Sequence, residues 1–417
     1  MDTAARNRRQ RFLLSCLVIG VVLRAIPMLW GSAFFHRDQF ALHPDESKIV
    51  RYADDFPGSL STNGDFRYPL LVHHVSALAW WPVKSAFGWD DDGVYVQWAQ
   101  DEQRMPEEVS MVGEWSYERA LLFLRGLLVL IYGIGGTLLL MALTSRLGFE
   151  RAVPWVAAAS ALQPWPIVTT AVVQTDTAGA YMLALVFFVL AGVERRGRYS
   201  SADAVRVGAA IGGAIAARYT SGVGLVGAAW VIAQAVRSKT LSGSAAAAFG
   251  AKAAAAAALT FVAIVPGSVY RFADFRRSLQ YEFQSKQAIT TLDLDQIWDA
   301  LTQCAPVWLL VPTGLGAIIA WRARRRDQRT RTSTLTSIAI TLAVYFAATS
   351  KSLVPDYCMP LMPVAAVLTG IALESFWRRG QRGGSRALAV TWLILAFAIT
   401  SATVYQRYAA DTRYQVD

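Results

Sequence analysis

The residues from Phe12 to Trp30, FLLSCLVIGVVLRAIPMLW, form a nearly unbroken apolar run that carries one charge, at Arg24. About 20 apolar residues are enough for a helix to cross a bilayer. The run follows a basic N-terminus, as the core of a signal peptide does, but it is too long for such a core and lacks a small-residue cleavage site. It therefore predicts an uncleaved first membrane-spanning helix.

Ten further apolar runs follow along the 417-residue chain, which is 54% apolar and only 17% charged. An average soluble protein is about 25% charged. Because the apolar residues are bunched, the sequence predicts an all-α polytopic membrane protein with about 11 transmembrane helices. The predicted spans are 12–31, 120–143, 152–168, 177–193, 206–218, 221–236, 253–270, 298–320, 335–349, 358–376 and 387–404.

The net charge of +10 is spread over short arginine clusters between the apolar runs. Such clusters mark the cytoplasmic ends of membrane helices, and their dispersal argues against nucleic acid as a partner. With the N-terminus inside, all four clusters fall on the cytoplasmic side. We expect one transmembrane domain, 1–417, in a cytoplasmic (inner) membrane. The clusters are Arg6, Arg8, Arg9, Arg11; Arg195, Arg196, Arg198; Arg322, Arg324, Arg325, Arg326; and Arg378, Arg379, Arg382.

The same topology places 32–119 and 271–297 outside. The first loop holds fifteen of the thirty acidic residues, between Asp38 and Glu118, against six Lys and Arg from Arg37 to Arg104. Its apolar stretch 69–87 predicts an interfacial helix. The second loop carries basic residues that break the charge rule. They either do so by chance or contact an anionic substrate or headgroup; they are Arg271, Arg276, Arg277 and Lys286.

The segment 206–236 is too long for one plain span and has basic flanks on both sides. Two short helices that meet near Arg218–Gly222 explain both features. A break at membrane depth is tolerated only where it is buried in protein or lines a wet cavity.

Two acidic sites lie on the predicted outer side. His43-Pro44-Asp45-Glu46 either starts a helix, which suits proline and acidic residues, or supplies a general base for an alcohol acceptor. Asp176, at the entrance of the fourth span, is either an N-cap or a further carboxylate facing the same cavity.

Three arginines, Arg24, Arg125 and Arg218, lie at similar depth in the outer half of their spans. An intramembrane charge is costly and usually marks function, although each side chain could instead snorkel to the interface. The arginine fork suits phosphate. Carboxylates and arginines in one outward layer fit an alcohol nucleophile and a phosphate leaving group.

The order of these motifs resembles the GT-C superfamily of membrane glycosyltransferases, which includes protein O-mannosyltransferases and aminoarabinose transferases. One departure is Asp356, where members often carry Arg before the tyrosine. The matching residues are Arg24; Asp45 and Glu46; Tyr68-Pro69; Arg125; Pro164 to Thr175-Asp176; Ala217-Arg218-Tyr219-Thr220, usually with Lys in place of Arg218; Val265-Pro266; Phe275; Tyr281-Glu282; Lys351; and Tyr357 to Pro363.

The resemblance implies an inverting transfer of a hexose or mannose-like sugar from a polyprenyl-phosphate carrier to a hydroxyl of a glycan, lipid or protein, beside membrane lipid. Asp45 would be the base, Glu46 would orient the acceptor or a metal, and Asp176 would assist. The donor phosphate would be held by Arg218 and Lys351, with Arg125 and Arg24. Further pocket candidates are His43, Tyr219 and Tyr357.

A divalent metal, Mg²⁺ or Mn²⁺, is compatible with three converging carboxylates, since hard cations take oxygen ligands. Asp45, Glu46 and Asp176 would hold it, but no cofactor is required by the sequence. Two other functions stay open: a transporter or flippase of a lipid-linked or anionic substrate, which also uses broken helices, and a non-catalytic membrane subunit that keeps the fold.

Overall fold

The computed structural model describes most of the chain, and the described part is built from helices joined by turns and short connections. The described residues are 3–28, 44–59, 66, 70–88, 114–163, 166–167, 169, 173–287, 307–326, 332–349, 358–379 and 384–413. 

The helices are α1 (Thr3–Met28), α2 (Pro44–Asp54), α4 (Leu71–Phe87), α5 (Glu114–Leu128), η1 (Val129–Gly136), α6 (Thr137–Arg146), η2 (Glu150–Ala152), α7 (Val153–Ala161), α9 (Thr175–Arg196), α10 (Ser201–Ala217), η3 (Tyr219–Val223), α11 (Gly224–Arg237), α12 (Gly243–Ile264), α13 (Gly267–Tyr270), α14 (Phe272–Gln287), α16 (Val307–Arg326), α17 (Thr332–Thr349), α18 (Leu361–Arg379) and α19 (Gly384–Arg413).

A helix overlaps each of the eleven predicted spans, so the prediction of a polytopic helical membrane protein is confirmed. In the described residues, five helices are long and apolar enough to cross a membrane. Three shorter apolar helices accompany them, Leu309–Ala323, Ser333–Phe346 and Arg386–Ala402. The five are Arg119–Arg146, Thr175–Arg196, Tyr219–Arg237, Gly243–Ile264 and Leu361–Arg379.

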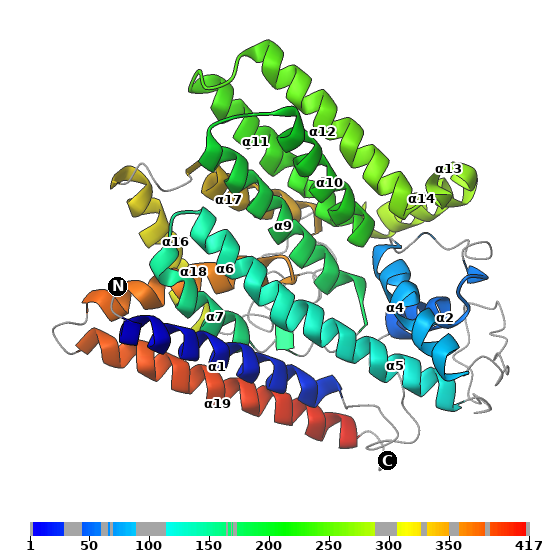
Figure 1. Ribbon diagram of the computed structural model, residues 1–417, viewed down its shortest axis with the longest axis horizontal. Coiled ribbons are helices and arrows are strands. Elements are labelled where there is room, and N and C mark those ends of the chain that lie inside the picture. Colours follow the sequence, from blue (N-terminus) through cyan, green and yellow to red (C-terminus); the bar gives the residue numbers. More distant parts are fainter. Residues whose placement is uncertain are drawn as a thin grey trace.

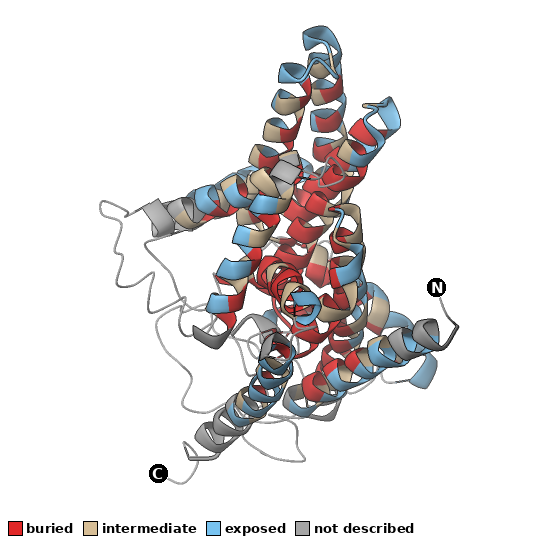
Figure 2. Ribbon diagram, turned by 90° about the vertical axis from the view of Figure 1, so that its left-hand side faces the viewer, coloured by how far each residue is buried: buried red, intermediate tan, exposed pale blue. Residues whose placement is uncertain are grey.

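Helix α9 forms the centre of the bundle and contacts α6, α10, α11, α17 and α18. In the most apolar 18-residue stretch of α9, 78% of the residues are buried inside the protein. In the corresponding stretch of α12, at the margin of the bundle, 11% are buried. Buried residues accordingly concentrate on the central helices in Figure 2. The short helices α2, α4, α13 and α14 gather at one end, where α12 ends and α5 begins (Figure 1). By the predicted topology this is the outer end.

Helices α10 and α12 pack unusually closely because glycines of α10 face alanines of α12. A side chain on Gly208 would run into the Ala253 carbonyl, and one on Gly212 would run into the Ala257 carbonyl. Small residues at this spacing let helix backbones approach each other in membranes. The alanine-rich stretch therefore supplies a packing surface.

The span predicted at 253–270 lies earlier in the chain, since α12 runs from Gly243 to Ile264. Alanine has the highest helix propensity, so the alanine-rich stretch before 253 continues the helix. The helix ends at its C-cap, Val265, because a residue before proline is disfavoured in the α conformation; Pro266 follows.

The long helix from Arg119 to Arg146 contains a π-helical stretch, η1, between its two α-helical parts. Gly133 of η1 lies against the Arg24 side chain, and Gly136 lies against the Tyr181 ring. Such insertions are often found at functional sites. Here the π-helical stretch presents two glycines to the large buried side chains of α1 and α9.

Helices α2 and α4 form a unit held by polar and aromatic contacts. Trp80 Nε1 donates to Asp54 Oδ1 at 3.1 Å, and Lys84 Nζ lies 3.1 Å from the same oxygen. The Tyr52 ring packs edge-on against His73 and His74. The helix predicted at 69–87 is confirmed as α4.

Candidate functional site

The chain breaks at Arg218, between α10 and α11. Arg218 takes an extended conformation, with φ −157° and ψ 127°, and a 3₁₀ turn from Tyr219 to Val223 leads into α11. The Arg218 carbonyl accepts a hydrogen bond from Ser221 N at 2.9 Å, which closes the turn. The break predicted near Arg218–Gly222 is confirmed.

Arg218 forms an ion pair with Asp176 across the interface between α10 and α9. The two side chains are 12% and 7% exposed, and Arg218 Nη1 also lies 3.4 Å from Thr175 Oγ1. The N-cap of α9 is Gln174, and Asp176 lies in its first turn, so Asp176 is not the N-cap. Its carboxylate instead neutralises a buried guanidinium.

Gly179, one turn along α9 from Asp176, makes this approach possible. A Cβ atom on Gly179 would lie 2.7 Å from Arg218 Cβ and 2.8 Å from Ser221 Oγ. Real Cβ atoms do not come so close to neighbouring atoms. Because glycine has no side chain, the helix break at Arg218 can pack directly against α9 at Gly179.

The first outer loop is fixed to the break through Phe66. The Tyr219 hydroxyl donates to the Phe66 carbonyl at 2.8 Å, and Phe66 N donates to Ser278 Oγ at 3.3 Å. Phe275 of α14 packs against the rings of both Phe66 and Tyr219. Segments more than a hundred residues apart in sequence thus meet beside Arg218.

Tyr52 and His74 connect α2 to α4 in this outer layer. Burial raises the pKa of Tyr52 to about 12, so its hydroxyl keeps its proton at neutral pH. Burial also lowers the pKa of His74, which favours the neutral ring. The Tyr52 hydroxyl can therefore donate to His74 Nδ1, 3.1 Å away.

The acidic motif begins the same unit. Asp45 and Glu46 lie in the first turn of α2, which confirms the predicted helix start, while their side chains lie outside the described part of the structure. Helix α2 packs on α4 and α5, and α4 contacts α10. The backbone of the acidic motif thus belongs to a unit that contacts α10 through α4.

Other candidate residues fall outside the described residues. They are His43, Lys351 and Tyr357. Their roles stay predictions.

The other two intramembrane arginines, Arg24 and Arg125, are fully buried between helices. Arg24 donates to the carbonyls of Gly20 and Ser160, both at 2.9 Å, and so links α1 to α7. Arg125 Nη1 donates to the Met28 carbonyl at 3.4 Å. Neither side chain snorkels to the surface. Their proposed contact with phosphate stays a prediction.

The basic residues of the second outer loop differ in their surroundings. Arg271 pairs with Asp274 at 2.9 Å, whereas Arg276 and Arg277 are exposed on α14. The side chain of Lys286 lies outside the described residues. Both interpretations of this loop remain open.

No group of three His, Cys, Asp or Glu side chains that could hold a metal occurs among the described residues. Asp176, one of the three predicted ligands, is paired with Arg218. A cation would have to compete with that guanidinium. The predicted Mg²⁺ or Mn²⁺ site therefore stays a hypothesis, to which Asp176 contributes only if the ion pair opens.

Sequence reasoning missed Gly179 and Phe66. Gly179 is one of many glycines in apolar runs, and its position three residues after Asp176 is the only signal that links it to the site. Phe66 acts through its backbone, which no residue pattern reveals.

No family model and no curated protein matches the sequence. Solved structures do resemble the fold. ArnT of Cupriavidus metallidurans, bound to undecaprenyl phosphate, matches with a TM-score of 0.60 at 16% identity, over 95% of this chain and 77% of that one. The oligosaccharyltransferase AglB of Archaeoglobus fulgidus, in complex with an inhibitory peptide and a dolichol-phosphate, matches with a TM-score of 0.56 at 12% identity.

The match to AglB covers 95% of this chain and 56% of that one. The apo form of the same archaeal enzyme matches with a TM-score of 0.56 at 14% identity, over 94% of this chain and 56% of that one. This chain therefore spans little more than half the length of the archaeal enzyme. At these identities the likeness concerns the fold.

Proposed function

Since the chain has the fold of the GT-C membrane glycosyltransferases, we propose that it is an inverting glycosyltransferase. It transfers a sugar from a polyprenyl-phosphate carrier to an acceptor hydroxyl at the extracytoplasmic face. The sugar is a hexose or mannose-like residue, and the acceptor is a glycan, a lipid or a protein. The site opens outward from a cytoplasmic membrane.

One observation carries the proposal: the buried pair of Arg218 and Asp176 at the helix break. A guanidinium has five N–H donors, and both contacts described above, to Asp176 and Thr175, come from Nη1. The Asp176 carboxylate can therefore orient the guanidinium that we propose for the donor phosphate. Two structural relatives, ArnT and AglB, were solved with lipid phosphates.

In the proposed reaction the acceptor oxygen attacks the anomeric carbon from the face opposite the phosphate. Asp45 takes the hydroxyl proton as the new C–O bond forms. The bond between the anomeric carbon and the phosphate oxygen breaks, and the phosphate leaves with the electron pair. Arg218 and Lys351 stabilise the charge that develops on it. Inversion at the anomeric carbon follows from this single displacement.

The remaining candidates have supporting roles. Asp176 holds the Arg218 guanidinium in place, and Glu46 orients the acceptor. Arg24 and Arg125 fix the surrounding helices and add positive potential. His43, Tyr219 and Tyr357 line the pocket; the bond from the Tyr219 hydroxyl to Phe66 supports a place at its wall.

A transporter or flippase is the alternative, because broken helices also occur in transporters. Transporter sites lie near the bilayer midplane. Here the break follows the last residue of α10, at the end where α4, α13 and α14 gather. The position of the break therefore favours surface chemistry over transport.

The test uses the purified protein in lipid nanodiscs with a panel of polyprenyl-phosphate sugars and measures which donor is consumed. We expect transfer from one donor class, and loss of transfer in Asp45→Asn, because an amide cannot accept the hydroxyl proton. Asp55→Asn is the matched control, since Asp55 lies just after α2 and is half-buried.

Retained turnover in a folded Asp45→Asn protein would remove the proposed base. Vesicle uptake of a lipid-linked sugar without any transfer would instead support the transporter. Chelation of divalent cations tests the metal: full activity in a chelator removes Mg²⁺ or Mn²⁺ from the reaction.

A further inference from the structure

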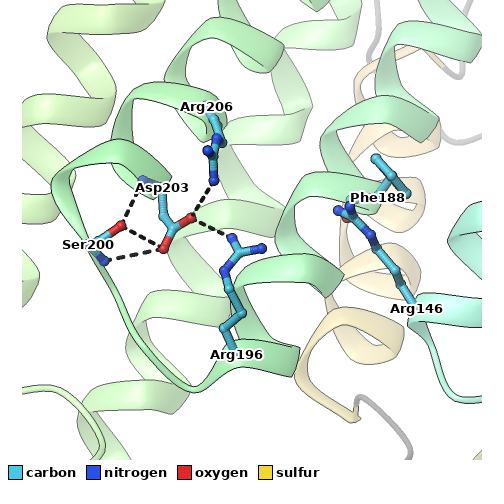
Figure 3. Close-up of polar contacts among 6 residues, drawn as sticks. All are labelled: Arg146, Phe188, Arg196, Ser200, Asp203 and Arg206. Atoms are coloured by element: carbon cyan, nitrogen blue, oxygen red, sulfur yellow. Dashed lines mark hydrogen bonds and ion pairs between the residues drawn. The ribbon is translucent and has the colours of Figure 1, made fainter.

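Five arginines crowd the end of the bundle opposite the Arg218–Asp176 pair. Arg146 ends α6, Arg195 and Arg196 end α9, Arg198 follows, and Arg206 lies in the second turn of α10. The charges of Arg195, Arg196 and Arg206 all act on Arg146. Figure 3 shows Arg196 and Arg206 directed at Asp203, with Arg146 on the other side of Arg196.

Two acidic residues of the described part of the chain, Glu194 and Asp203, lie among these arginines or beside them. Glu194 accepts from Ser333 N and Thr334 N, both at 3.0 Å, and so caps the start of α17. Asp203 pairs with Arg196 and lies 3.4 Å from Arg206 Nη1, and it also completes a capping box with Ser200. The Asp203 carboxylate thus faces two guanidinium groups, those of Arg196 and Arg206.

Two of these guanidinium groups share the space above Gly192. The Nη1 atoms of both Arg146 and Arg196 lie within 4 Å of the point that a Cβ on Gly192 would occupy. Arg146 is anchored there, because its Nη1 donates to the Phe188 carbonyl at 3.1 Å and its guanidinium lies over the Phe188 ring. Two guanidinium charges this close repel each other, and an anion bound between or beside them would offset the repulsion.

Helix dipoles explain part of the arrangement. Cations are favourable at helix C-termini, which accounts for Arg146, Arg195 and Arg196. Arg206 lies near the N-terminus of α10, where a cation is unfavourable. It lies 3.4 Å from Asp203, the carboxylate that it shares with Arg196.

We propose that Arg146, Arg196 and Arg206 bind the phosphodiester headgroup of an anionic phospholipid in the adjacent leaflet. The cluster stands at the ends of membrane-spanning helices, at headgroup level, and arginine forks match phosphate oxygens. Basic sites between transmembrane helices on the cytoplasmic side bind such headgroups. The inference is independent of the proposed sugar transfer.

The test measures lipid binding to the purified full-length protein in detergent, with phosphatidylglycerol, phosphatidylcholine and inorganic phosphate as probes. Each arginine near an anionic headgroup contributes roughly fivefold in affinity. We expect Arg206→Gln to weaken phosphatidylglycerol binding about fivefold, and Arg146→Gln/Arg206→Gln roughly twenty-five-fold. Arg206 is 64% exposed, so its single variant should fold normally.

Arg237→Gln is the matched control, because Arg237 is an exposed arginine in the last turn of α11 at the same end. We expect it to weaken phosphatidylglycerol binding less than Arg206→Gln does, because Arg237 is not among the arginines that surround Arg146 and Asp203. Unchanged phosphatidylglycerol binding in the Arg206 variant would overturn the proposal. So would equal binding of phosphatidylcholine, equally effective competition by inorganic phosphate, or an equal loss in the control.

Discussion

Arg218 and Asp176 depend on each other because both charges are buried. Removing one partner from such a pair leaves an uncompensated charge and costs roughly 3–5 kcal/mol, whereas an apolar replacement of both is often nearly neutral. We therefore expect Asp176→Asn to lower the unfolding temperature strongly and Asp176→Leu/Arg218→Met to lower it less. Thermal unfolding in detergent measures both.

Asp274→Asn is the comparison for this pair. Asp274 bonds to Arg271 at 2.9 Å, but both side chains are about one-third exposed. An exposed pair contributes only about 0–1 kcal/mol, so this variant should unfold close to the wild type. Equal destabilisation by the single and double variants at Asp176 would contradict the coupling.

At the residue scale, the sequence predicted the charges but not their pairing. Arg218 stands out because a charge in an apolar run is rare, and Asp176 because it precedes a span. That the two meet depends on how α9 packs against α10 and on the space left by Gly179. The two residues are 42 positions apart in sequence, so no local pattern links them.

At the element scale, the contact between α10 and α12 depends on Gly208. A side chain there would collide with the Ala253 backbone, so Gly208→Ala should force the helices apart. Overpacking typically costs about 1–3 kcal/mol. We expect a lower unfolding temperature, measured in detergent.

Gly250→Ala on α12 is the control for this contact, because a Cβ at Gly250 would meet nothing within 4 Å. It should leave stability unchanged or raise it slightly, since alanine favours helix. If both variants unfold at the same temperature, the close approach is not what holds the two helices.

The docking of α2 on α4 should depend on pH through His74. Burial lowers the pKa of His74 below its ordinary value of 6.5. Between the lowered pKa and 6.5 the unfolded chain binds a proton that the folded protein does not, so stability rises with pH in that window and levels off above about 6.5. The unfolding temperature of the wild type should therefore fall below pH 6.5.

His74→Gln removes the titrating group and should flatten this part of the profile. Tyr52→Phe removes only the hydroxyl that bonds to His74 Nδ1, so it should lower stability but keep the pH dependence. Parallel profiles of wild type and His74→Gln between pH 5 and 8 would show that His74 does not control this docking.

Element boundaries followed from the sequence only in part. The spans predicted at 12–31, 177–193 and 358–376 stop at arginine clusters, whereas α1, α9 and α18 continue through them. The break at Arg218 was predicted because 206–236 is too long for one span. The start of α12 was misplaced because the alanines before residue 253 are only moderately apolar, while their helix propensity is high. Hydropathy and propensity disagree there, and propensity determines where the helix begins.

At the scale of the whole molecule, the orientation in the membrane can be tested by labelling. Ser85 near the end of α4 and Ser244 near the start of α12 are both exposed. We expect a membrane-impermeant maleimide to label Ser85→Cys in intact cells, and to label Ser244→Cys only after the membrane is opened. The native Cys16 and Cys358 are buried and should react little.

A variant without native cysteines is the background for this experiment. The reverse labelling pattern would place the acidic motif and the helix break inside the cell, and would remove the proposed outward site. Equal labelling of both positions in intact cells would point to leaky membranes and calls for the same comparison in sealed vesicles, where either one-sided pattern decides the orientation.

The membrane-spanning helices followed from the apolar segments of the sequence. The packing of the short helices α2, α4, α13 and α14 did not, because its contacts join distant segments. The bond from Tyr219 to Phe66, for example, spans 153 residues and uses a backbone carbonyl. Contacts of that kind leave no periodicity in the sequence.

The π-helical stretch from Val129 to Gly136 also fixes how α5 and α6 are rotated relative to each other about the axis of their common helix. A π-helical turn holds more residues than an α-helical one, so the stretch turns Arg125 at one end of the helix relative to Arg146 at the other. Deleting one residue here would leave a continuous helix but would rotate its two halves by about 100° against each other, at 3.6 residues per turn. The irregularity thus fixes which way Arg125 and Arg146, at the two ends of this helix, point relative to each other.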